Sequence, residues 1–268
     1  MPERQLRLAT ILSHPDDETF GIGGTLIKYT DAGVECHSLS LTQGEAGANG
    51  DPADPIPRER LGEARAAELA EAGRRMGIAS TTCFTYPDGK LAQASAADVV
   101  RDIVRWLRAK RPDVVITWGP DGGYGHPDHV ATGPLTLHAI ELAGIQRHEP
   151  GLGEHVHVRR CYQTVVPAAA FDRLRELAPD FAAYMDTLAV RPHRWTEEEL
   201  GAVIDIRDVA DRKWHAMQAH RSQVVDLERL ARLRDTMGFV TQEETYIRAF
   251  PDPGGPPLET DLFAGVKR

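Results

Sequence analysis

The sequence predicts an α/β protein of the Rossmann-like, doubly wound class, with a mostly parallel sheet and helices on both of its faces. Through the first two-thirds of the chain, short apolar runs alternate with helical patterns, and turn residues separate them. Strands that alternate with helices in this way are typical of right-handed βαβ units and a parallel sheet. The 268 residues suffice for one large core, so we expect a single domain over residues 1–268.

Strands are expected where a short apolar run ends at turn residues. The predicted strands cover residues 8–12, 34–41, 82–86, 114–118 and 160–166. The fourth is the best delimited, because Pro112-Asp113 precedes it and Gly119-Pro120 follows it. A further short apolar stretch surrounds Ile204.

Helices are expected where apolar residues recur at helical spacing. The predicted helices cover residues 19–32, 57–76, 97–109, 128–143, 209–219 and 226–234. The second is the strongest, since Ala, Glu and Arg fill it and Pro57 stands at its start. From residue 251 the chain is rich in Pro and Gly, which predicts an extended tail.

Composition and charge exclude several classes of partner. The net charge is −9 and Lys and Arg form no run, so we expect neither nucleic acid nor an anionic membrane surface as a partner. Residues 1–12 lack the apolar stretch of a signal peptide, and no later segment is long and apolar enough to span a membrane. Cys36, Cys83 and Cys161 are odd in number and form no CxxC pair, which favours buried thiols in a reducing cytoplasm.

Two loops stand at the carboxyl ends of predicted strands. Residues 43–57 follow the second strand, and residues 119–127 follow the fourth. Open α/β sheets bind their ligands at this edge, and long loops in compact domains are often functional. If the strand order is 3-2-1-4-5, the first and fourth strands are neighbours, and His14 and His129 meet although they are far apart in the sequence.

Each of these two strands is followed by a His-Pro-Asp motif, in SHPDDE at residues 13–18 and in GHPDH at residues 125–129. Imidazole and carboxylate groups are the ligands that zinc or ferrous iron accepts. One such motif is equally well explained as a turn with a helix cap. Two copies after neighbouring strands favour a catalytic metal site, in which three protein ligands leave a position open for water.

The motifs HPDDE at residues 14–18 and GGYGHPDH at residues 122–129 resemble those of the PIG-L/LmbE-like metal-dependent N-acetylglucosaminyl deacetylases. Weaker similarity continues in AHRSQ at residues 219–223 and in ETDLF at residues 259–263. The resemblance implies one LmbE-like domain, one divalent metal ion with zinc ahead of ferrous iron, and a small-molecule substrate. Exposed sheet edges and the habit of the family favour a homo-oligomer.

Carried over residue by residue, the resemblance implies three metal ligands, His14, Asp17 and His129. It implies that Asp16 is the general base for the attacking water. The residues alone leave the roles of Asp16 and Asp17 open, because either carboxylate could face the ion.

The resemblance also assigns roles in the second motif. It implies that His126 stabilises the developing oxyanion and protonates the leaving amine, and that Tyr124 polarises the amide carbonyl. Asp128 would orient a metal-binding histidine from behind.

Four further residues are candidates for substrate contact. Arg60 resembles the substrate-binding arginine of the family, and the alternative is a solvated pair with Glu63 on the same helix face. Asp88 either binds sugar hydroxyls or is a turn residue. Glu45 is better explained as a solvated loop charge, and for His220 a place in the pocket and a place outside it are both open.

The leading hypothesis is a metal-dependent hydrolase that deacetylates an N-acetyl amino sugar and releases acetate. A thiol-conjugate amidase of the mycothiol type is the alternative on the same fold. Such amidases carry a Lys shortly after HPDDE, whereas this chain has none before Lys28, which favours the deacetylase. A non-catalytic metal- or nucleotide-binding module is disfavoured, because the GIGG segment at residues 21–24 lies inside a predicted helix and carboxylates occupy the turn before it.

Overall fold

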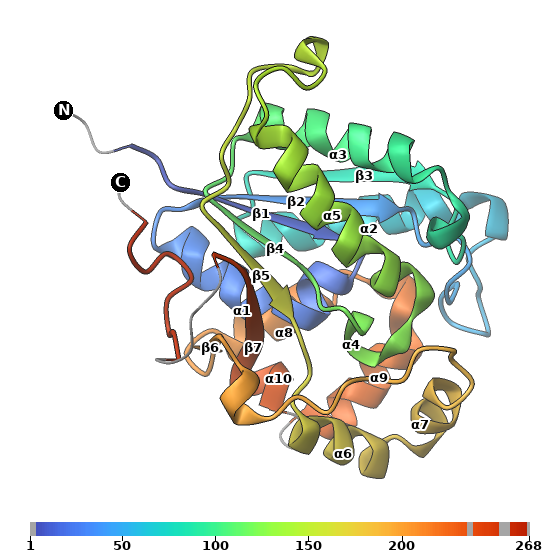
Figure 1. Ribbon diagram of the computed structural model, residues 1–268. Helices are drawn as coiled ribbons and strands as arrows, with labels where there is room; N and C mark the ends of the chain where they lie inside the picture. The colour runs from blue at the N-terminus through green and yellow to red at the C-terminus, as the bar shows by residue number, and fades with distance from the viewer. Residues whose placement is uncertain (1–3, 235–237, 252–257, 267–268) are drawn as a thin grey trace.

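The computed structural model describes residues 4–234, 238–251 and 258–266, and its core is one seven-stranded sheet (Figure 1). The strands are β1 (Arg7–Leu12), β2 (Glu35–Thr42), β3 (Ser80–Tyr86), β4 (Val114–Trp118), β5 (Arg160–Thr164), β6 (Ala202–Asp205) and β7 (Glu243–Phe250). Their order is β3-β2-β1-β4-β5-β7-β6. The first five strands are parallel, and β7 runs antiparallel to β5 and β6. The doubly wound, mostly parallel class and the strand order 3-2-1-4-5 are therefore confirmed.

The predicted helices are present, with small shifts at their ends. They are α1 (Asp17–Asp31), α2 (Arg58–Met76), α3 (Ala96–Lys110), α5 (Pro127–Gly144), α8 (Ala210–Met217) and α9 (Val224–Leu233). Helix α1 begins before its predicted start, directly after the first His-Pro-Asp motif. Asp17 and Glu18 form its first turn. Acidic side chains stabilise that end of a helix, although they add nothing to an apolar pattern.

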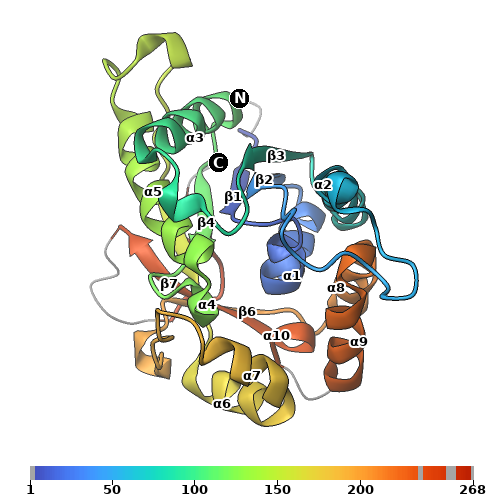
Figure 2. The same cartoon turned by 90° about the vertical axis from the view of Figure 1, so that its right-hand side faces the viewer.

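Helices cover both faces of the sheet (Figure 2). Along β1, Leu8 and Leu12 face the core cluster that α1, α2 and α8 complete. Ala9 and Ile11 face the opposite cluster, where they meet α3 and α5. A strand that is buried on both faces needs apolar residues at consecutive positions, and this explains the continuous apolar run of β1.

The structure also contains short elements that the sequence did not predict, most of them after β5. They are the helices α4 (Gly122–Gly125), α6 (Ala168–Leu177), α7 (Pro179–Met185) and α10 (Gly238–Thr241), the 3-10 turns η1 (Leu91–Gln93), η2 (Pro150–Leu152), η3 (Glu197–Glu199) and η4 (Arg221–Gln223), and strand β7. Helices α6 and α7 lie beside α4, at the carboxyl edge of the sheet (Figures 1 and 2). Among the described helices, none combines the length and apolar composition that a membrane span requires. Most of the predicted extended tail, residues 252–257, lies outside the described residues.

Helix α1 bends at Ile22, where φ is −139° and ψ is 17°. A carboxylate from β7 fills the break: Glu244 accepts hydrogen bonds from the backbone N–H groups of Gly24 (2.9 Å) and Thr25 (2.7 Å). Lys213 neutralises this buried carboxylate at 2.7 Å. The glycine-rich stretch therefore lies inside a helix, as expected, and its free N–H groups bind a protein carboxylate rather than being arranged around a phosphate.

Candidate metal centre and active site

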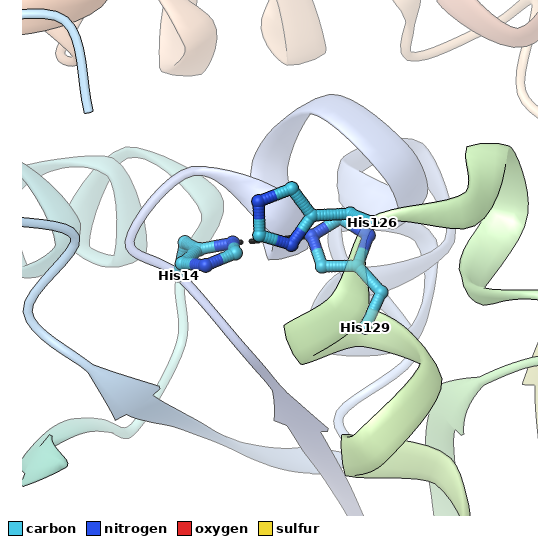
Figure 3. Close-up of side chains that lie close together, drawn as sticks. All are labelled: His14, His126 and His129. Carbon is cyan, nitrogen blue, oxygen red and sulfur yellow. Dashed lines mark hydrogen bonds between the residues drawn. The ribbon is translucent and has the colours of Figure 1, made fainter. Parts of the chain in front are cut away.

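The pairing of β1 with β4 brings the two His-Pro-Asp motifs together. Leu8 and Thr10 of β1 lie opposite Val114 and Ile116 of β4. The chain that leaves each strand at the same edge carries one motif, so Nδ1 of His14 lies 3.1 Å from Nε2 of His129 (Figure 3). The predicted meeting of these two histidines is confirmed.

The side chain of Asp17 joins the two histidines at this point. Oδ1 of Asp17 lies 3.3 Å from Nε2 of His129, and its Oδ2 lies 3.6 Å from Nδ1 of His14. Donors of a tetrahedral zinc ion lie about 3.3 Å from one another, given zinc–nitrogen distances of about 2.0 to 2.1 Å. The separations therefore match those of a single small cation.

Hydrogen bonds behind the two histidines orient their rings. Nδ1 of His129 is 3.1 Å from the carbonyl oxygen of Gly122, and Nε2 of His14 is 3.0 Å from Asp88 and 3.3 Å from Asp128. Nδ1 of His14 and Nε2 of His129 therefore face each other at 3.1 Å, the distance of a hydrogen bond between the rings. Burial opposes a charge on His14, but its hydrogen bonds to nearby carboxylates, led by Asp128, raise its pKa well above the usual value, so a proton lies between the two rings. A metal ion would replace that proton, and the residues therefore fit a metal ion.

The two oxygens of Asp17 have different environments. Oδ2 accepts hydrogen bonds from the backbone N–H groups of Ser13 (3.0 Å) and His14 (2.8 Å). Oδ1 is the oxygen that lies close to His129. The turn before α1 thus holds the carboxylate by Oδ2 and leaves Oδ1 facing His129.

Asp16 has a different orientation from its neighbour. It is the residue before α1 and has a φ of 136° and a ψ of −29°, a strained conformation for a residue with a Cβ. Its Oδ2 accepts a hydrogen bond of 2.8 Å from Nη2 of Arg65. Burial raises the pKa of Asp16 to about 7, and the positive charge of Arg65 acts in the opposite direction. A carboxylate with such a pKa is suited to accept a proton near neutral pH.

His126 stands above the two histidines, with its ring centre 4.8 Å from each (Figure 3). Its Nδ1 accepts the backbone N–H of Asp128 at 3.3 Å and so caps helix α5. Burial, together with the charges of His129 and His14, lowers the pKa of His126 to about 4. The ring is therefore neutral at pH 7, and with Nδ1 as an acceptor its Nε2 carries the proton.

Tyr124 lies on the glycine-rich turn α4, where its ring contacts His129 at 5.2 Å and Phe181 of α7 at 5.2 Å. Gly125 has a φ of 96°, and a Cβ there would overlap the carbonyl oxygen of Val190. The segment around residue 190 therefore packs directly on the turn that carries Tyr124, which only a glycine at position 125 allows.

The candidate substrate residues differ in their surroundings: Arg60 is exposed to solvent, whereas Asp88 and Glu45 are hydrogen-bonded to other parts of the chain. Arg60 is exposed in the first turn of α2. The Asp88 side chain is buried between His14 and the backbone N–H of Ala46, which is 2.9 Å from its Oδ2. Glu45 is not the solvated loop charge that was expected, because its Oε1 accepts the N–H of Asp88 at 2.9 Å and its Oε2 is buried.

His220 lies behind the first motif rather than between the two motifs. It is fully buried, and its Nε2 lies 3.1 Å from Oγ1 of Thr19 and 3.5 Å from Oε1 of Glu18. Its neighbour Ser222 donates to Glu68 of α2, the helix that follows the long loop. The AHRSQ segment therefore supports the site from outside.

Arg65, the buried partner of Asp16, was not predicted from the sequence. A signal was present, because Arg65 lies midway between Leu61 and Leu69 on the apolar stripe of α2, all three of them buried. An arginine on the buried face of a helix needs a partner in the core.

Comparison with known proteins agrees with the motifs. The family model described as GlcNAc-PI de-N-acetylase matches residues 9–140. A 1D-myo-inositol 2-acetamido-2-deoxy-alpha-D-glucopyranoside deacetylase 2 from Saccharopolyspora erythraea is 33% identical and aligns over 95% of this chain and 98% of its own. The conserved protein TT1542 from Thermus thermophilus is 27% identical with a TM-score of 0.66, over 92% of this chain and 96% of that one.

The N,N'-diacetylchitobiose deacetylase from Pyrococcus horikoshii has the same fold, with a TM-score of 0.69 at 22% identity. The similarity covers 97% of this chain and 86% of that chain. It extends through the region after β5, where the sequence pattern was least regular.

Proposed function

Since the chain belongs to the GlcNAc-PI de-N-acetylase family, we propose that it is a metal-dependent hydrolase that removes acetate from an N-acetyl amino sugar. The observation that carries the proposal is the convergence of Nδ1 of His14 and Nε2 of His129, 3.1 Å apart, beside the carboxylate of Asp17. His14, Asp17 and His129 would hold the ion. Zinc suits two nitrogens and one carboxylate oxygen, and ferrous iron is the alternative.

When bound, the ion supplies a Lewis acid that makes water acidic and polarises the amide carbonyl. The residues of the chain supply the proton transfers. Asp16 stands next to Asp17 and accepts the proton of the attacking water. Collapse of the tetrahedral adduct requires a proton on the leaving nitrogen. We assign this proton to Asp16, which took it from water, rather than to His126 as first expected, because the pKa of His126 is lowered to about 4 while that of Asp16 is raised to about 7.

Two donors stabilise the negative charge that develops on the carbonyl oxygen. Nε2–H of His126 is one, because Nδ1 of the same ring is committed to the backbone N–H of Asp128. The hydroxyl of Tyr124, whose ring packs against His129, is the second. Fixed donors in a buried site need no reorganisation when charge develops, and one such donor is worth about 10²- to 10³-fold in rate.

Asp128 supports the site from behind. Its carboxylate accepts the backbone N–H groups of Gly89 (2.7 Å) and Leu91 (3.0 Å) and the Nε2–H of His14. It therefore fixes the tautomer of His14. We assign Arg60 and Asp88 to substrate contact, with Asp88 also bonded to His14.

The site takes a small molecule, and the relatives act on an N-acetylglucosamine conjugate, as their names state. We further propose a cytoplasmic homo-oligomer. Free Cys36, Cys83 and Cys161 support the reducing compartment. The unprotected edge strand β3, which pairs only with β2 among the described strands, supports contact between copies.

The test is acetate release from N-acetylglucosamine conjugates, including the inositol glycoside of the relatives, by protein loaded with zinc or ferrous iron. Asp16→Asn should lower the rate of release about 10²- to 10⁴-fold, while the exposed control Asp98→Asn leaves it unchanged. A thiol conjugate should release no cysteine adduct. Absence of acetate release from every conjugate, with an intact ion, would contradict the proposal.

A further inference from the structure

The guanidinium of Arg65 joins two segments of the site. It is buried, with 3% of the residue exposed, and it lies on the inner face of α2. Its Nη2 donates to Oδ2 of Asp16 (2.8 Å) and to the carbonyl oxygen of Pro15 (2.9 Å). Its Nη1 donates to the carbonyl oxygen of Gly44 (2.7 Å) in the long loop. One side chain therefore holds both the first motif and the loop.

The backbone of the long loop lies directly against this guanidinium. Gly44 has a φ of 65°, and a Cβ at Gly44 or at Gly47 would overlap Nη1 of Arg65. Only residues without a Cβ let the backbone approach a buried charge so closely. The two glycines and the arginine thus form one packing unit.

Asp16 needs an external anchor because its own backbone does not favour the conformation that it adopts. Its φ of 136° lies in a region that residues with a Cβ rarely occupy. Nη2 of Arg65 bonds both its carboxylate and the carbonyl of the preceding Pro15, so it fixes the side chain and the peptide before it. A planar guanidinium can do this, whereas an ammonium offers no such fixed fork.

We propose that Arg65 is a positioning residue that holds the Asp16 carboxylate in its productive orientation, an inference that rests on the proposed function. The hydrogen bonds of Arg65 go to Asp16, Pro15 and Gly44. Its contribution is made through Asp16, so the rate should fall when it is removed while substrate affinity changes less. A displacement of about 1 Å at a reacting group can cost about 10²-fold in rate.

The experiment measures kcat, KM and bound metal for Arg65→Met, Arg65→Lys, Asp16→Asn and the double variant Asp16→Asn/Arg65→Met. We expect Arg65→Met to lower kcat about 10²-fold with full metal content, and Arg65→Lys to fall between it and the parent. In the Asp16→Asn background, Arg65→Met should cause no further loss. Arg74→Met is the matched control, since Arg74 is exposed on the same helix and pairs with Glu71.

Arg65→Lys keeps a buried cation and carries the test if Arg65→Met fails to melt cooperatively. The inference is overturned if the variants change only KM, because Arg65 then serves the loop alone. It is also overturned if Arg65→Met and Asp16→Asn multiply in their effects on kcat. A parent protein that releases acetate from no conjugate would overturn the proposed function, and the positioning role with it.

Discussion

The two His-Pro-Asp motifs have the same three residues, but their side chains make different contacts. In the first, the helix begins after the motif: Asp16 precedes α1 and Asp17 is its first residue. In the second, the helix begins within the motif: His126 is the cap and Pro127 is the first residue of α5. The same tripeptide is therefore placed at two different registers relative to the helix start.

Because of this difference in register, equivalent side chains of the two motifs make different contacts. His14, before the helix, offers Nδ1 to the shared centre, whereas His126 uses Nδ1 to cap its own helix. Asp16 turns to Arg65, while Asp128 turns back to two loop N–H groups and His14. The position of the helix start thus decides whether a residue of the motif faces the shared centre, caps its own helix or bonds to a neighbouring segment.

The largest expected effect separates the two histidines. His14→Ala should lose the bound ion and all activity, because it removes one of the three proposed ligands. His126→Asn retains a capping side chain, so it should keep the ion and lower kcat about 10²- to 10³-fold. Elemental analysis and acetate release measure the two quantities. Loss of the ion in His126→Asn would show that His126 is a ligand.

The two aspartates should also differ, because a substitution of Asp16 should affect kcat and not metal affinity. Asp16→Asn should lower kcat about 10²- to 10⁴-fold, because an amide cannot accept the proton, and should leave metal affinity unchanged. The measurement is kcat at saturating substrate, with metal affinity from competition with a chelator. Loss of the ion in Asp16→Asn would indicate that Asp16 rather than Asp17 is the ligand.

Asp128→Asn should weaken metal affinity about 10- to 100-fold, because the group behind His14 loses its charge and one acceptor. With saturating metal its kcat should recover most of the parent value. Chelator competition followed by titration with zinc measures both effects. A kcat that stays low at saturating zinc would show that Asp128 takes part in the reaction directly.

Much of the fold, and the meeting of the two motifs, was predictable from the sequence. The apolar runs predicted five parallel strands, and the predicted strand order brought His14 and His129 together. Short-range patterns suffice here, because each strand is buried on both faces and each motif stands where a strand ends.

The remainder depends on contacts between distant segments. Strand β7 was missed because its sequence, EETYIRAF, contains charged residues, and the buried Glu244 is satisfied by Lys213. The burial of Arg65 against Asp16 depends on a loop that only tertiary packing places. Helices α6 and α7 have only ten and seven residues, and their buried positions are limited to Phe171, Ala182 and Met185, so no extended apolar stripe predicted them.

The smallest expected effect concerns the second proline. Pro127 is the first residue of α5, where its missing N–H is no loss and its fixed φ suits the helix. Pro127→Ala should therefore reduce the free energy of unfolding by at most about 1 kcal/mol, mainly by giving the unfolded chain more freedom. Its kcat should stay close to the parent value, since His126 caps the helix independently of the ring of Pro127.

Urea unfolding gives the stability of Pro127→Ala, and acetate release gives its kcat. Pro15→Ala is the matched variant, because Pro15 precedes the strained Asp16 and its carbonyl accepts from Arg65. If the helix register decides the roles, Pro15→Ala should lower kcat more than Pro127→Ala, because an alanine frees the peptide that orients Asp16. Equal effects of the two substitutions on kcat would mean that the prolines only stiffen turns and that the register is set elsewhere.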